Sequence, residues 1–190
     1  MPLRCHRRQG RSEHRWHANW RRCRSGHRRH ALALQHGTLD PQKATQAIDF
    51  IRTFADKCHH AKEEDVLFVR MESVGFPHDN GPIAVMLHDH DSGRAFVRAM
   101  ADVVQDAARG DADALRIFAN NAHGYTEMLR EHIQKEDKVL YPMADQSFDK
   151  GDQAELLAAF ERADKQAGAG IHERYAELAS FESMFRKGTQ

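Results

Sequence analysis

The sequence predicts an all-α protein, an up-down antiparallel four-helix bundle with a C-terminal helical extension. Three observations predict this fold. From residue 40 onward, apolar residues recur at the spacing of a helix face. No stretch shows the alternation of apolar and polar residues that is typical of a strand. A ten-residue motif occurs on two separate predicted helices, which indicates a duplicated structural unit.

The first predicted helix begins at Asp40, a helix-capping residue, because Pro41 then takes the first helical position. It runs to about Glu72, and a glycine- and proline-bearing connection follows it. Pro82 starts the next helix. The apolar face of the first helix carries Ile48, Ile51, Ala55 and Val66.

The helix from Pro82 ends at Gly110, and a third helix starts near Asp111. We expect the third helix to end at Pro142, because a proline inside a helix loses a hydrogen bond and clashes with the preceding turn. The apolar stripe of the earlier helix carries Ile83, Met86, Val97 and Val104. That of the later helix carries Leu115, Phe118, Tyr125, Leu129 and Val139.

Another helical stretch begins near Asp152, is interrupted by the glycine-bearing segment 167–170, and resumes at 171–181. We expect residues 149–190 to form a helical extension outside the bundle, and residues 37–148 to form the bundle itself.

Residues 1–36 differ in kind from the rest of the chain. The first thirty contain ten arginines, no lysine and one acidic residue, whereas the other 160 carry 18 basic and 27 acidic residues. An arginine-rich, lysine-free amino-acid composition of this kind resembles the translation of GC-rich DNA in the wrong reading frame. The segment is therefore either aberrant or disordered in place of the first bundle helix, or a genuine segment, in which Trp16, Trp20 and Cys23 share one helical face.

Composition argues against two classes of protein. No window approaches 18 uninterrupted apolar residues, so we expect no membrane span, and no apolar segment follows a charged start, so we expect no secretory signal. The three cysteines are odd in number and widely separated, which favours the reducing cytoplasm over a disulfide framework.

The repeated motif reads H-x-x-K-E-[ED]-x-V-L-[FY] at residues 59–68 and 132–141. Residues four apart lie on one face of a helix. His59 therefore shares a face with Glu63, and His132 shares a face with Glu136. Both pairs share a stripe with apolar residues and should point inward. A buried carboxylate is costly unless it is paired or binds a metal, so the pattern predicts a cation between the two helices. The alternative, surface pairs that support each helix, does not explain the shared stripe.

His90 lies on the apolar stripe of its helix, 42 residues before His132. A duplicated unit would place a histidine near 42 residues before His59. His17 lies at 42 and His14 at 45, and spacing alone does not choose between them.

Other residues near these positions have ordinary interpretations. His60, Glu64 and His88 each neighbour a predicted ligand but point about 100° away on an α-helix, so we expect boundary or surface positions. Tyr125 lies two turns before His132 on the same face. It is either a core tyrosine or a second-shell residue whose hydroxyl reaches a ligand bound to the metal.

Three motifs together resemble the hemerythrin HHE cation-binding family, namely HHxKEE-x-VLF at 59–68, GPIxVMLHDHDSGR at 81–94 and LREHIQKEDKVLYPMAD at 129–145. Within it, the chain is most similar to bacterial di-iron proteins of the iron–sulfur cluster repair type. The resemblance implies two non-haem iron ions, with Mn or Zn as alternatives, held by four histidines and two glutamates. Glu13-His14-Arg15 best matches the first helix of the family's bundle, which would precede the helix that begins at Asp40. The implied metal ligands are His14, His59, Glu63, His90, His132 and Glu136.

The chain departs from the family pattern at two points. Oxygen carriers have a further histidine one turn before the ligand that corresponds to His90. This chain has Met86 at that position. The separate cysteine-containing N-terminal domain of the repair proteins is also missing. The resemblance still implies that the glutamates bridge the irons, and that a position stays open for O2, NO or peroxide.

The sequence therefore favours a di-iron protein that binds or reacts with O2, NO or peroxide, in sensing, iron handling or a repair-like stress response. It does not decide whether the protein is an enzyme or what its oligomeric state is. One alternative is a metal-poor helical bundle with a basic, nucleic-acid-binding N-terminal tail, although nucleic acid is not the favoured partner. Another is a bundle damaged by loss of its first helix.

Overall fold

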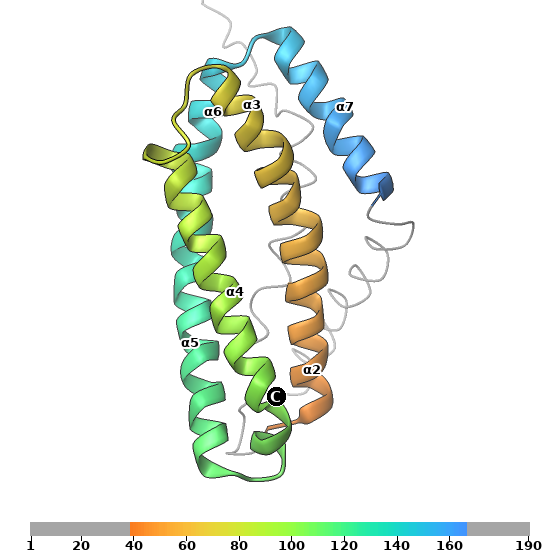
Figure 1. The fold of residues 1–190 in the computed structure, drawn as a ribbon, viewed down its shortest axis with the longest axis vertical. Helices are drawn as coiled ribbons and strands as arrows, with labels where there is room; N and C mark the ends of the chain where they lie inside the picture. The colour runs from red at the N-terminus through yellow and green to blue at the C-terminus, as the bar shows by residue number, and fades with distance from the viewer. Residues whose placement is uncertain (1–38, 167–190) are drawn as a thin grey trace, which may run out of the picture.

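The computed structural model describes residues 39–166, which form three long helices and one shorter helix, and no strand occurs among them (Figure 1). The first long helix comprises α2 (Pro41–Phe50), the π-helical segments η2 (Ile51–His60) and η3 (Glu63–Phe68), and α3 (Val69–Ser73). The second is α4 (Gly81–Ala108). The third comprises α5 (Ala112–Lys135), the π-helical η4 (Glu136–Leu140) and α6 (Tyr141–Ser147), and α7 (Lys150–Gln166) follows.

The helix ends lie where capping chemistry predicts them. The Asp40 carboxylate accepts hydrogen bonds from the backbone N–H groups of Gln42 and Lys43, at 3.0 and 3.1 Å. The Asp111 carboxylate accepts one from the N–H of Ala114 at 2.9 Å. Gly110 follows α4 with φ of +93°, a left-handed conformation that favours glycine. The predicted starts near residues 40, 82 and 111 are therefore confirmed.

The predicted end at Pro142 is wrong, because the third helix continues through α6 to Ser147. Pro142 stands in the first turn of α6, directly after the π-helical segment η4. A π turn shifts the backbone from i→i+4 to i→i+5 bonding, and it relieves the loss of the proline N–H at the point where an α-helix resumes. The same wide turn displaces Val139, which was predicted on the apolar face but is 46% exposed.

Two apolar clusters occupy the interior, one at each end of the long helices. The α2-side cluster includes Ile48, Phe54, Val97, Met100, Val104 and Phe118. The α6-side cluster includes Leu67, Phe68, Met71, Ile83, Met86 and Leu140. The layer between them is polar and holds the residues discussed below.

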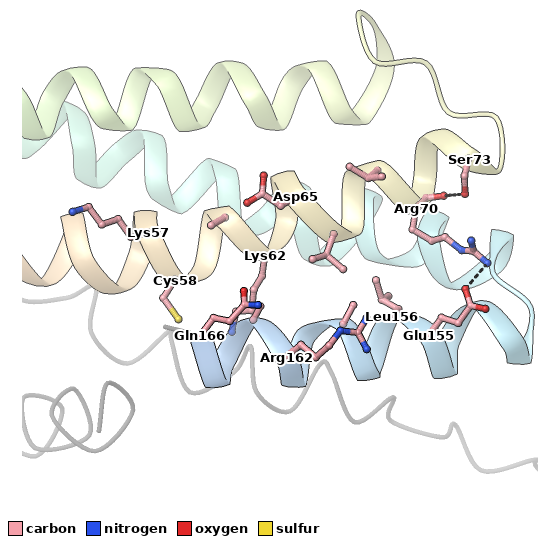
Figure 2. A pocket seen from close by; sticks show the side chains of 15 residues that line it. Lys57, Cys58, Lys62, Asp65, Arg70, Ser73, Glu155, Leu156, Arg162 and Gln166 are labelled. Atoms are coloured by element: carbon pink, nitrogen blue, oxygen red, sulfur yellow. Dashed lines mark hydrogen bonds and ion pairs between the residues drawn. The ribbon is translucent and has the colours of Figure 1, made fainter. Parts of the chain in front are cut away.

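Helix α7 lies along the outer side of the first long helix (Figure 1). Leu156 inserts into the α6-side cluster and is 2% exposed. The Lys62 ammonium contacts Asp164 at 2.7 Å, and Arg70 pairs with Asp152. A groove of about 750 Å³ remains between the two helices, with Cys58 on its wall (Figure 2).

Several predictions concern residues outside 39–166, among them a helix at 171–181, the face shared by Trp16, Trp20 and Cys23, and a ligand at His14. The four-helix arrangement and the division at residues 36 and 148 therefore stay predictions. Between residues 39 and 166, no helix combines the length and apolar character needed to cross a bilayer.

Candidate metal centre

Five of the six predicted ligands lie together in the polar layer between the two apolar clusters. The Glu63 carboxylate lies 3.4 Å from Nε2 of His59 and 3.3 Å from Nε2 of His90. The Glu136 carboxylate lies 3.0 Å from Nε2 of His132 and 3.9 Å from Nε2 of His59. All five are buried. Three helices, distant in sequence, thus bring their imidazoles and carboxylates to one point.

His60 is also buried, so the prediction of a boundary or surface position for it is wrong. It is the last residue of the π-helical segment η2. A π turn holds more residues than an α turn, so successive side chains are separated by less than 100° and two neighbours can face the same way. The His60 ring stacks on the His90 ring, with centroids 3.8 Å apart and planes 11° from parallel. His88, in the straight helix α4, is exposed as predicted.

Two of the histidines contact carboxylates outside the centre through Nδ1, the ring nitrogen that does not face Glu63 or Glu136. Nδ1 of His132 lies 3.2 Å from the buried Asp89, which also pairs with Lys135 at 2.7 Å. Nδ1 of His90 lies 2.7 Å from Glu64, a boundary residue as predicted. A hydrogen bond at one ring nitrogen fixes the tautomer, so the other nitrogen is presented to the centre.

Arg94 connects a second pair of carboxylates to the same site. Its guanidinium donates to Asp56 at 2.8 Å and to Glu64 at 2.7 Å. Asp56 in turn lies 3.4 Å from Nδ1 of His60. The contact with His60, followed by the guanidinium of Arg94, lowers the pKa of Asp56 to about 2, although burial opposes this.

Sequence reasoning missed Tyr141, whose hydroxyl donates a hydrogen bond to Glu63 at 2.7 Å. Its signal was the tenth position of the repeated motif, where the first copy has Phe68. Tyr125, the residue singled out instead, is buried in the α2-side cluster beside Gly93. Its predicted contact with a metal-bound ligand stays a prediction.

The close approach of so many titratable groups separates their pKa values. Burial and the nearby charge of Glu63 raise the pKa of Glu136. Burial also opposes ionisation of Glu63, but His59 and His90 outweigh it and lower its pKa. Burial lowers the pKa of His59 well below the usual value. Burial acts the same way on His132, but its contacts with Asp89 and Glu136 prevail and raise its pKa to about 10.

The donor atoms that face the interior of this layer fit a metal. Within residues 39–166, several buried atoms make no hydrogen bond, namely Oε2 of Glu63, both carboxylate oxygens of Glu136, and Nε2 of His90 and of His132. Unsatisfied buried polar atoms of this kind are costly, and a divalent cation would satisfy all of them. Imidazole and carboxylate donors suit iron, manganese and zinc.

The donors form two adjacent groups of three. One comprises His59, Glu63 and Glu136, and the other comprises His60, His90 and His132. Within each group the ligand atoms lie within 4.8 Å of one another. The layer therefore provides two places at which a cation could be held.

Comparison with known proteins agrees with this chemistry. The chain is 30% identical over 88 residues to the iron-sulfur cluster repair protein YtfE of Dickeya chrysanthemi (strain Ech1591). That match covers 45% of this chain and 40% of the relative, so the chain spans less than half of its length. No solved structure matches the chain closely enough to support a comparison. The Hemerythrin HHE cation binding domain matches residues 17–144, well over half of the chain. The chain therefore belongs to the hemerythrin HHE cation-binding family.

Proposed function

We propose that this protein is a non-haem di-iron protein that binds or reacts with O2, NO or peroxide. The observation that carries the proposal is the pair of buried carboxylates, Glu63 and Glu136, which face three histidines from three helices. Two adjacent groups of donors support two ions rather than one. Manganese and zinc share these donor preferences and are the alternative occupants.

Iron ions in such a site supply redox chemistry and coordination positions that the protein does not fill. The protein's own residues prepare the surroundings. Asp89 and Glu64 orient His132 and His90. The Tyr141 hydroxyl donates its proton to Glu63 at 2.7 Å. The apolar clusters on either side limit the access of water.

The cation-binding family supports a role in sensing or iron handling, and the name of the relative supports a stress response like that of iron–sulfur repair. We place this role in the cytoplasm because the three cysteines are odd in number and widely separated. Met86, one turn before His90, is fully buried and brings a thioether where an oxygen carrier has an imidazole. We therefore favour sensing or reaction with NO or peroxide over simple oxygen transport.

Anaerobic titration of the full-length, metal-free protein with Fe(II) tests the proposal. We expect saturation at about two irons per chain, as in other di-iron bundles, followed by a change of absorption and EPR signals on exposure to NO or O2. The Glu63→Gln/Glu136→Gln double variant is the control and should bind little iron. An iron-free protein that stays folded and is retained on heparin would overturn the proposal and favour a basic nucleic-acid-binding tail.

A further inference from the structure

The first copy of the repeated motif carries a second buried histidine that is not among the six predicted ligands, although it belongs to one of the two donor groups. His60 is 9% exposed, although Lys57 in the preceding turn faces solvent. We infer that His60 is a fourth histidine of the metal centre, an inference that rests on the proposed function.

The position of the ring is the first support for this inference. The rings of His60 and His90 stack at 3.8 Å, and the His132 ring lies edge-on to His60 with centroids 6.0 Å apart. One ligand atom of each of the three lies within 4.8 Å of the others. The donor atom of His60 therefore lies near those of His90 and His132. Because imidazole binds a metal through a lone pair in the ring plane, the nearly parallel His60 and His90 rings would turn relative to one another to hold the same ion.

The residues behind His60 are the second support. Histidines that ligate a metal are usually held at the other ring nitrogen by a carboxylate. Asp56 lies 3.4 Å from Nδ1 of His60, as Glu64 and Asp89 lie behind His90 and His132. The Arg94 guanidinium contacts both Asp56 and Glu64 and so fixes the two carboxylates that lie beside the stacked rings. Glu64 is hydrogen-bonded to His90, whereas Asp56 lies near Nδ1 of His60 without a hydrogen bond.

The backbone supplies the third support. The π-helical segments η2 and η3 lie immediately before and after this part of the motif, and π turns are frequent at functional sites. They turn His59 and His60 inward together, toward the two different donor groups. With His60 included, residues 39–166 alone provide four buried histidines and two buried glutamates.

Three histidine variants of the full-length protein test this inference. We expect His60→Ala to lose one of the two irons, or to bind it at least about 10-fold more weakly. His88→Ala is the matched control, because His88 is exposed on α4 two residues before His90, and it should bind iron like the wild type. Added imidazole should restore the lost iron to His60→Gly, which only a missing donor explains.

The outcomes separate the two proposals. A wild-type protein that binds no iron contradicts the proposed function. Wild-type and His60→Ala proteins with the same iron content, affinity and EPR spectrum overturn the role of His60 alone. Circular dichroism of each metal-free variant establishes that it is folded. Should His60→Ala unfold, His60→Gln, which keeps a polar side chain of similar reach, takes its place under the same criterion.

Discussion

The two copies of the repeated motif, residues 59–68 and 132–141, share a π-helical segment of the backbone but make different side-chain contacts. In both, a π-helical segment begins at the glutamate, at Glu63 in η3 and at Glu136 in η4. The second position differs, because His60 joins the donor layer, whereas Ile133 packs against the α2-side cluster. A duplicated motif therefore conserves the pair of glutamates but leaves its neighbours free to take other roles.

The lysine and the aromatic residue of the motif show the same divergence. Lys62 reaches outward to Asp164 of α7, while Lys135 pairs with Asp89 behind His132. Phe68 lies with its ring 6.0 Å from that of His90, and the equivalent Tyr141 crosses to Glu63 of the other copy. The second copy thus supports the ligands of the first, which makes the two copies unequal in function.

The largest effect is expected where the copies are equivalent. Glu63→Ala and Glu136→Ala should each reduce the bound iron to less than about one per chain, because each removes a buried carboxylate from the donor layer. Metal analysis after anaerobic loading measures this. Glu131→Ala, next to His132 but exposed, is the control. One glutamate variant that kept both irons would show that only a single copy matters.

Removal of the supporting carboxylates should come next. Asp89→Asn and Glu64→Gln should each weaken iron binding by about 10- to 100-fold. Asp89 orients His132 and Glu64 orients His90, so each substitution removes the orientation of one histidine. The effect should be larger at Asp89, which is buried, than at Glu64, whose side chain is 25% exposed. Competition with a chelator of known affinity measures both. Equal affinities in wild type and Asp89→Asn would contradict the role of Asp89.

Tyr141→Phe breaks the bond that crosses between the copies. It leaves an oxygen of buried Glu63 without its donor, so the metal-free protein should lose about 1–3 kcal/mol of unfolding free energy. Urea unfolding of wild type and variant gives the difference. A loss near zero would mean that the hydroxyl does not stabilise Glu63. Phe68→Tyr, at the equivalent position of the first copy, should not restore stability to the Tyr141 variant.

The pH dependence of the metal-free protein should also distinguish the copies. The pKa of His132 is about 10 in the folded state against 6.5 for an ordinary histidine, so the folded state binds more protons between these values and its stability falls as pH rises through that window. The pKa of Asp56, beside His60, is about 2 against 3.8, so stability falls as pH drops from about 4 to 2.

Thermal unfolding of the metal-free protein across pH 2 to 10 measures both limbs. Asp89→Asn should reduce the alkaline limb above about pH 8 and leave the acid limb in place. Between about pH 4.5 and 8 the raised pKa of Glu136 contributes to the limb in both proteins. A wild-type alkaline limb in that variant would contradict the account of His132. Because iron displaces these protons, uptake of iron should release protons and tighten as pH rises.

The smallest effect is expected at the lysines. Lys62→Met should lower the unfolding free energy by about 1 kcal/mol, since it breaks a partly buried ion pair with Asp164 of α7, whose two side chains are 15% and 19% exposed, and it should leave iron binding unchanged. Lys135→Met should instead weaken iron binding through Asp89. A reversed result would remove the distinction between the two copies.

Most of the fold follows from local rules that the sequence displays. Asp40 and Asp111 cap their helices, and the apolar residues at helical spacing are largely those of the two clusters. The pairs His59/Glu63 and His132/Glu136 were predictable because their spacing of four residues coincides with the apolar stripe. Their meeting with His90 required only that the helices pack side by side.

The remainder depends on the π turns, which leave no periodic signal in a sequence. They bring His60 inward, expose Val139 and allow the helix to pass Pro142, all against expectation from α-helical geometry. Asp89 and Tyr141 gave weaker signals, one as an acidic neighbour of His90 and the other as a motif position. Their contacts are between helices, so only the packed structure reveals them.

Anomalous scattering at the iron edge, from crystals of the iron-loaded full-length protein, tests the central claim most directly. The account predicts two iron peaks in the polar layer, flanked by Glu63 and Glu136 and in contact with His59, His90 and His132. Iron found instead at exposed groups, such as the His78–Glu72 pair, with the polar layer holding none, would contradict it.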